Sequence, residues 1–486
     1  MSAVATRYEV VIGIECHVQL KTVSKMFCAC SSAVEGAPPN SIVCPVCLGL
    51  PGALPVINRR AVEHVLATGL AIGARTPDVT RWDRKNYFYP DLPKGYQISQ
   101  YDLPLAAGGT LAVETSAGPV EVGITRAHLE EDTARLIHQL DESGKRVSLV
   151  DFNRSGVPLM EIVTEPVIPS AEAARRYAEE LRALLVTIGA SDAAMEQGQM
   201  RVEANVSLRP PGTAAFGTRV EVKNMNSFRS VERAIGFEVE RQARALDAGE
   251  ALVQETRGWD DERGVTYTMR LKEESEDYRY FPEPDLPPLR TDAAWLAEIR
   301  AALPELPAAR RARYQSDYGL SAYDAGIVAS AGAYFDAAMG CEPRPDPKVA
   351  ASLLSKIALR ERNTAPDLLE VRPGTELAVA SNMRTSGALS SQNVEEVYAE
   401  HLRSGKPVAE IVAQQGLRQI SDESALGEAI ERVVAANPAA VADVRAGKRQ
   451  AIGFLVGQVM KETRGQADAA TVQRLLEARL AGGGEQ

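Results

Sequence analysis

The sequence predicts an α+β protein in which a β-rich first part is followed by helices. Segments such as Tyr8–Leu20 and Gln199–Arg209 alternate apolar and polar residues, as half-buried strands do. A Pro-rich stretch, Phe281–Leu289, interrupts regular structure and predicts a domain boundary. Beyond it, Thr291–Leu303 and Leu306–Tyr318 are rich in Ala, Leu, Glu and Arg at helical spacing. We therefore expect three domains, in residues 1–290, 291–405 and 406–486.

The first predicted strand has two chemically different faces. Ile12, Ile14 and Cys16 would lie on one face, and Glu15 and His17 on the other. Two later strands repeat this pattern, with Arg201 and Glu203 in one and Glu221 and Lys223 in the other. Such strands favour an antiparallel or mixed sheet that is covered on one side, leaving a concave polar surface. A merely solvated sheet face would give the same pattern.

The helical part is divided by Pro and Gly. A second Pro-rich turn, Glu342–Pro347, separates helices, and Gly405, Gly416 and Gly465 are candidate helix ends because Gly accepts the left-handed conformation.

Composition limits the function classes. The 486 residues include 54 Lys+Arg and 65 Asp+Glu, a formal net charge of −11, which argues against a nonspecific nucleic-acid coat. The sequence has no apolar run long enough to span a membrane, and its first residues do not resemble a signal peptide. We therefore expect a cytoplasmic protein without a membrane partner.

Four of the six cysteines are closely spaced. Cys28 and Cys30 are followed after thirteen residues by Cys44 and Cys47. Two thiolate pairs separated by a loop fit a closed tetrahedral Zn²⁺ site, which would be structural because it leaves no open coordination position. The alternative is four reduced cysteines without metal.

Carboxylates and histidines form a second, dispersed set. Glu15 and His17 share a strand face, a Glu130-Glu131-Asp132 run follows His128, and Glu161 lies among apolar residues. Mg²⁺ takes oxygen ligands and keeps several waters, so one or two protein carboxylates suffice for an ATP–Mg²⁺ site. Exposed or ion-paired carboxylates are the alternative for each residue. The sequence has no phosphate loop of the Gly-x4-Gly-Lys type, so it does not identify residues that contact ATP.

Two further segments are distinctive. Trp82–Gln97 and its echo Asp277–Asp285 combine aromatic and charged residues around prolines, which indicates either a binding surface or packed tyrosines. Near the C-terminus, residues 441–480 hold seven Lys+Arg and four Asp+Glu, a local balance of +3 that weakly favours phosphate contact.

Several motifs together resemble the B subunit (GatB) of the aspartyl/glutamyl-tRNA amidotransferases. They extend over nearly the whole chain in the family's order: Gly13–Lys21, Asp83–Asp91, Tyr96–Gln100, His128–Asp132, Asp277–Asp285 and Gly453–Gln458. The resemblance implies a β-rich cradle domain, a helical domain and a small helical tail domain.

The resemblance also implies an activity. Family members use ATP and Mg²⁺ to phosphorylate the side-chain carboxylate of Glu-tRNA(Gln) or Asp-tRNA(Asn), and ammonia then displaces the phosphate. The amidase, or A, component of the complex releases the ammonia from glutamine, and a small C component holds the other two together. The non-discriminating synthetase that supplies the mischarged tRNA is a further implied partner.

Site residues follow from the resemblance by position. His17, Glu131 and Glu161 match the Mg²⁺ ligands, with Glu15 beside His17. Lys85 matches a lysine of the ammonia path, where it would steer or deprotonate ammonium. The four cysteines match the zinc position, and the tRNA-contacting positions of the tail are matched by Lys448, Lys461 and Gln466.

Two other classes of function remain open from the sequence alone. A zinc-dependent hydrolase acting alone would need an open metal position, which a four-thiolate site lacks. A non-catalytic tRNA-binding scaffold would fit the basic tail but would not explain Glu15 and His17. Which of the two charged tRNAs is the substrate does not follow from the sequence.

Overall fold

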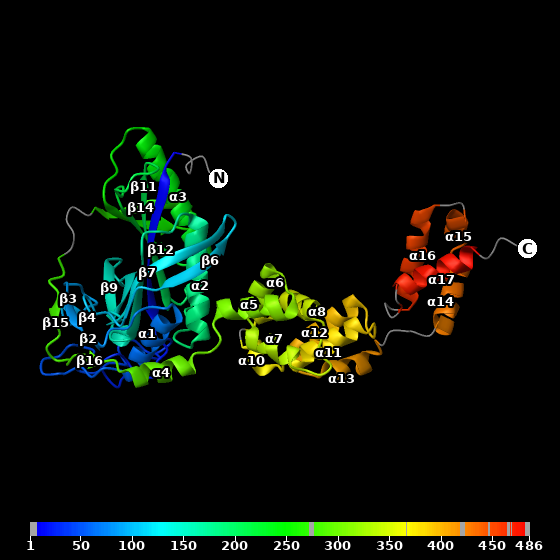
Figure 1. Cartoon of the computed structure of the whole chain (residues 1–486), viewed down its shortest axis with the longest axis horizontal. Helices are drawn as coiled ribbons and strands as arrows, with labels where there is room; N and C mark the ends of the chain where they lie inside the picture. Colours follow the sequence, from blue (N-terminus) through cyan, green and yellow to red (C-terminus); the bar gives the residue numbers. More distant parts are fainter. Residues whose placement is uncertain are drawn as a thin grey trace, which may run out of the picture. The chain divides into compact units, whose positions relative to one another are not determined.

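The computed structural model describes residues 7–271, 277–365, 367–417, 423–445, 448–463, 467 and 469–481. Contacts within the chain divide it into two compact units, one ending at Leu306 and the other beginning at Pro307 (Figure 1). The predicted division into three domains stays a prediction.

The first unit is built on one large sheet. Among the described residues this sheet has nine strands in the order β14-β13-β12-β11-β1-β10-β7-β5, with β6 paired to β7. Neighbouring strands are antiparallel except β12 and β13, which are parallel. The strands are β1 (Glu9–Gln19), β5 (Ala106–Ala107), β6 (Thr110–Thr115), β7 (Gly118–Glu131), β10 (Pro158–Thr164), β11 (Met200–Arg209), β12 (Val220–Met225), β13 (Glu255–Asp260) and β14 (Val265–Leu271).

Smaller sheets surround it. One has the order β15-β3-β4, one pairs β16 with β2, and β8 and β9 form a hairpin. These strands are β2 (Val79–Thr80), β3 (Asp83–Asn86), β4 (Tyr96–Ser99), β8 (Arg135–Leu140), β9 (Arg146–Asp151), β15 (Phe281–Pro282) and β16 (Leu289–Arg290), and a 3-10 turn, Phe152–Arg154, follows β9.

Helices pack on the apolar face of the large sheet. Three of them begin after a residue whose side chain accepts backbone N–H bonds: Asn58 for α1 (Arg59–Ala71), Ser170 for α2 (Ala171–Thr187) and Ser227 for α3 (Phe228–Asp247). Figure 1 shows α2 and α3 along one side of the strands, and α4 (Ala293–Ala302) contacts α1. The alternation predicted for the strands is confirmed, because Ile12, Ile14, Cys16 and Val18 are buried in the core beneath these helices.

The described part of the second unit is helical, as the sequence predicts. Its helices are α5 (Pro307–Tyr318), α6 (Ala322–Ala329), α7 (Gly332–Met339), α8 (Pro347–Leu353), α9 (Leu359–Arg362), α10 (Leu368–Val371), α11 (Thr375–Thr385), α12 (Ser391–Ser404), α13 (Val408–Gln415), α14 (Glu423–Ala436), α15 (Pro438–Arg445), α16 (Arg449–Glu462) and α17 (Ala469–Ala481), with a π-helical turn Leu354–Ala358. Gly405 and Gly416 end α12 and α13 in the left-handed conformation, which confirms these two predicted ends. The third, Gly465, lies outside the described residues.

The described residues of the second unit form two separate apolar cores, one within residues 314–412 and one within residues 426–480. No helix among the described residues is long and apolar enough to cross a membrane.

Candidate metal and phosphoryl-transfer site

The open face of the large sheet brings titratable side chains from three strands together. On β1 and β10, His17 is paired with Glu161, and on β10 and β7, Glu161 is paired with His128. Because directly paired residues project to the same face, these three side chains share the open side of the sheet with Glu15 and Glu130, which lie two residues from His17 and His128.

The side chains form a compact group around His17. Its Nε2 lies 3.3 Å from a Glu161 oxygen, 3.5 Å from Glu15 and 3.7 Å from Glu130. His128 Nε2 lies 3.8 Å from both Glu130 and Glu161. The Glu161 and Glu130 side chains are almost fully buried, with 6% and 2% of their surface exposed. Two overlapping sets, Glu15–His17–Glu161 and His128–Glu130–Glu161, therefore have ligand atoms close enough to hold a metal ion.

The electrostatics of this group favour a bound cation. Burial and the neighbouring Glu161 raise the pKa of Glu15 to about 7. Burial opposes protonation of His17, but Glu161, Glu130 and Glu15 outweigh it and raise the His17 pKa to about 9. The three carboxylates thus favour a positive charge at the position of His17, which a bound cation would supply. Carboxylate oxygens suit Mg²⁺ or Mn²⁺, so the residues fit the predicted metal.

The structure places one residue of the predicted metal set apart from the others. Glu131 does not join the group, because successive residues of a strand project to opposite faces and Glu130 occupies the open face. Glu131 Oε1 instead accepts bonds from Lys94 Nζ at 2.6 Å and from the Ile98 backbone N–H at 3.0 Å. The residue of this pair that lies beside His17 is therefore Glu130.

Lys85 lies beside the carboxylates, under a group of tyrosines. Its Nζ is 5.0 Å from the ring centre of Tyr278, which packs edge-on against Tyr87 and Tyr280. Burial lowers the Lys85 pKa, but Glu130 and Glu161 outweigh burial and the net shift is upward. Lys85 is therefore held as a cation, which suits steering of charge better than proton abstraction. These contacts also show that the tyrosines of both aromatic segments gather at one site.

Sequence reasoning assigned no role to several residues around the site. Arg126 Nη2 lies 3.6 Å from Glu161, and Arg126 Nε donates to His128 Nδ1 at 3.3 Å. Asp132 is held by Arg201 at 3.2 Å and by Gln19 at 2.9 Å. Arg126, His128 and Glu130 alternate along one strand, and this spacing is the signal that could have identified Arg126 and His128 as part of the site.

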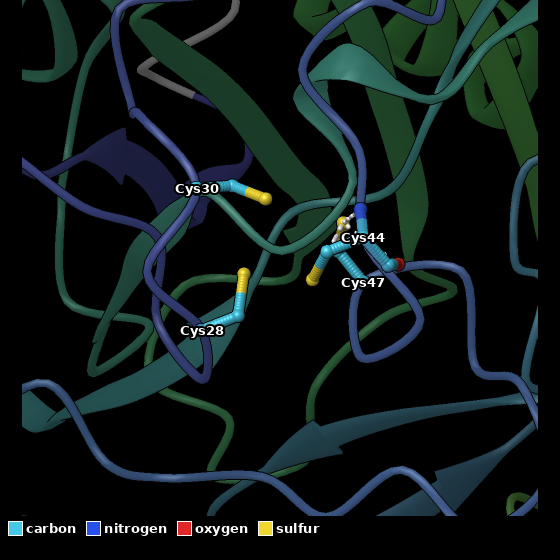
Figure 2. A group of neighbouring side chains, drawn as sticks. All are labelled: Cys28, Cys30, Cys44 and Cys47. Carbon is cyan, nitrogen blue, oxygen red and sulfur yellow. Dashed lines mark hydrogen bonds between the residues drawn. The ribbon is translucent and has the colours of Figure 1, made fainter.

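The four cysteines meet in one loop region beside the sheet (Figure 2). Their sulfur atoms all lie within 4.8 Å of one another, and the Cys44 and Cys47 sulfurs are 3.9 Å apart. A tetrahedral site with Zn–S bonds of about 2.3 Å requires sulfur–sulfur distances of roughly 3.8 Å. A hydrogen bond from Cys28 lowers the Cys47 pKa to about 4, against the effect of burial. The donor set therefore fits Zn²⁺.

A cavity of about 260 Å³ adjoins this loop. Cys28 and Cys47 line it from the loop, and Lys94 and Glu131 line it from the sheet side. The ion pair that Glu131 forms thus faces this cavity and not the open face.

The predicted tail residues are only partly described. Lys448 is 68% exposed and its Nζ lies 2.9 Å from Asp443, and Lys461 is exposed near the end of α16. Gln466 lies outside the described residues. The described lysines leave room for contact with a partner.

Comparison with known proteins identifies the family. Residues 10–297 match the family model described as "GatB/GatE catalytic domain", and residues 333–480 match "GatB domain". The B subunit of the aspartyl/glutamyl-tRNA(Asn/Gln) amidotransferase of Moorella thermoacetica is 51% identical, over 97% of this chain and 100% of its own length. The proteins of the same name from Carboxydothermus hydrogenoformans and Thermomicrobium roseum are 48% and 49% identical, each over at least 97% of this chain and 99% of its own length. The chain therefore belongs to the family of aspartyl/glutamyl-tRNA(Asn/Gln) amidotransferase B subunits.

Proposed function

We propose that this chain is the component that activates the aminoacyl group in an ATP-dependent tRNA amidotransferase, with Glu-tRNA(Gln), Asp-tRNA(Asn) or both as substrate. The observation that carries the proposal is the group of three carboxylates and two histidines on the open face, formed by Glu15, His17, His128, Glu130 and Glu161. Membership of the family supplies the reaction, and this group supplies a place for its first step.

The first step transfers a phosphoryl group. An oxygen of the aminoacyl side-chain carboxylate attacks the γ-phosphorus of ATP, the bond to the β-phosphate oxygen breaks, and ADP leaves. A divalent cation held by His17, Glu130 and Glu161, with Glu15 beside them, would offset the negative charge on the phosphoryl oxygens. Arg126 and Lys85 add two fixed positive charges next to these ligands.

The second step replaces phosphate by nitrogen. Ammonia attacks the carbonyl carbon of the acyl phosphate, the carbon–oxygen bond breaks, and inorganic phosphate leaves while the nitrogen loses a proton. Lys85, held as a cation, would steer charged groups along the path by which ammonia reaches the acyl phosphate. The product is Gln-tRNA(Gln) or Asn-tRNA(Asn).

The proposal includes partners. Ammonia would come from the amidase (A) component, and the small C component would complete a heterotrimer. The lysines of the tail, Lys448 and Lys461, and with them Gln466, would contact the tRNA, and a non-discriminating synthetase would supply it. Zn²⁺ on the four cysteines would fix the loop beside the cavity. Since its substrate is made for translation, we place the protein in the cytoplasm.

Reconstitution tests the proposal. The chain is combined with its amidase and small partners and given each charged tRNA with ATP and glutamine, and amidated tRNA is measured. We expect product with at least one of the tRNAs, and we expect His17→Ala to abolish it while glutamine hydrolysis continues. Full amidation by His17→Ala would favour the non-catalytic scaffold and contradict the role of this site.

A further inference from the structure

A row of paired residues connects the metal group to the edge of the large sheet. Glu15 on β1 is paired with Glu203 on β11, and the pairing of β11 with β12 is irregular at this point. On the far side of the irregularity, Lys223 on β12 is paired with Gly258 on β13, and Gly258 with Tyr267 on β14. Lys223 Nζ bridges the irregularity, 2.8 Å from a Glu203 oxygen. Tyr267 therefore lies in the same row as Glu15, four strands away, or roughly 19 Å at about 4.8 Å per strand.

The aromatic ring of Tyr267 lies across Gly258, its neighbour in this row. A Cβ added at Gly258 would be 2.6 Å from the ring Cζ, so a larger residue would displace the ring. The side chain is nevertheless 41% exposed. Because Gly258 covers one side of the ring, the exposed area lies on the outer side, toward the open face.

A residue in the left-handed conformation supports the ring. Asn224 has φ of 65°, which is uncommon for a residue other than Gly, and it lies where the pairing of β11 and β12 is irregular. Its Nδ2 donates to the Tyr267 hydroxyl at 3.4 Å and lies 4.0 Å from the Met269 sulfur. Met269 is 50% exposed beside the ring.

An exposed aromatic ring on a rigid bed suits a flat, uncharged ligand. Lys223 already lies beside Glu203 and Glu221, at 2.8 and 3.4 Å, so this part of the row offers little positive charge for phosphate. Unpaired nucleic-acid bases stack on such rings whatever their sequence. A charged tRNA with its aminoacyl group at Glu15 and His17 has its preceding nucleotides near that group, and the row that leads to Tyr267 offers them a surface on the same face.

We propose that Tyr267 stacks on an unpaired base near the 3′ end of the tRNA substrate, with Gly258 and Asn224 holding the ring in place. The inference rests on the proposed function, because it takes the aminoacyl end of a tRNA to lie at the metal group. It adds a binding surface four strands from the chemistry.

A thermodynamic cycle tests this proposal. Binding of the full-length chain is measured at one salt concentration with intact tRNA and with the same tRNA trimmed of its unpaired 3′ nucleotides. We expect Tyr267→Leu to weaken binding of intact tRNA by roughly 5- to 150-fold and to leave the trimmed tRNA unchanged. Tyr267→Phe keeps the ring and should bind as the natural chain does. Tyr323→Leu, at a 77% exposed tyrosine of α6, is the matched control and should bind each of the two tRNAs as tightly as the natural chain does.

Each other outcome is informative. An equal loss for intact and trimmed tRNA would overturn the stacking role, as would a raised KM for ATP with unchanged tRNA binding, which would point to the adenine of ATP. If Tyr267→Leu does not fold, Gly258→Ala is used instead, because its added methyl group displaces the ring. It should likewise weaken binding of intact tRNA and leave binding of trimmed tRNA unchanged. If the natural chain binds neither tRNA, the proposed function itself fails.

Discussion

Glu130 and Glu131 are neighbours in the chain with different surroundings, and replacing each by Gln makes a prediction with an internal control. Glu131→Gln leaves the Lys94 cation without the carboxylate that it contacts at 2.6 Å, and these two side chains are only 4% and 11% exposed. Breaking a buried pair of this kind costs about 3–5 kcal/mol of unfolding free energy. Affinity for a divalent cation on the open face should change little.

Glu130→Gln should have the opposite effect. It removes one of three carboxylates around His17 and one of the carboxylates that face the Lys85 cation, but Glu15 and Glu161 remain, so the metal-free fold should lose less stability than in Glu131→Gln. Affinity for Mn²⁺ or Mg²⁺ should fall by more than the ~10–100-fold that loss of an outer partner of a metal ligand costs.

Two measurements separate the variants. Calorimetric titration with Mn²⁺ gives the metal affinity. Tryptophan fluorescence in urea follows the first unit alone, because all three tryptophans, Trp82, Trp259 and Trp295, lie in it. If Glu131→Gln lost as much metal affinity as Glu130→Gln, or unfolded at the same urea concentration as the natural chain, the assignment of the two faces would be wrong.

Three further predictions concern protons, zinc and tRNA. Since the His17 pKa is raised to about 9 and a metal binds the neutral ring, Mn²⁺ affinity should rise about tenfold per pH unit from 7 to 9 and then level off; a flat profile by calorimetry would remove His17 from the ligands. The same raised pKa stabilises the metal-free fold below about pH 6.5, and this contribution is lost as the pH rises through about 9. Elemental analysis should find one Zn²⁺ per chain and much less in Cys44→Ser; equal zinc in both would contradict the four-thiolate site. Replacing Lys448 and Lys461 by Gln should reduce the salt dependence of tRNA binding by about one unit of log–log slope for each phosphate contact, and an unchanged slope would mean that neither lysine meets a phosphate.

The sequence predicted the parts of the site that follow from strand alternation. Glu15 and His17 could be placed on one face because the residues between and beside them are apolar, and the same held for Arg201 and Glu203. The cysteine spacing likewise anticipated the cluster of sulfurs.

The parts that failed depend on contacts between distant segments. Glu130, Glu131 and Asp132 are three acids in succession, so no apolar residue marks which of them faces the core. The register with β10 decides this, and the bond from Lys94 to Glu131 joins residues 37 positions apart. Likewise, the contacts of Asn224 and Gly258 with Tyr267 exist only because β12, β13 and β14 lie side by side, and no local sequence pattern predicts that pairing.

The back-to-back arrangement of Glu130 and Glu131 on β7 also limits how this stretch of chain can vary in length. Inserting or deleting one residue just before His128 would exchange the two faces, so that Glu131 would leave Lys94 and Glu130 would leave His17. A change of two residues would restore the faces but shift the pairing with Glu161 along the strand. Length changes in this protein should therefore be tolerated in hairpin turns such as Asp141–Lys145, which connects β8 to β9, and not in the few residues where one strand serves two chemical environments.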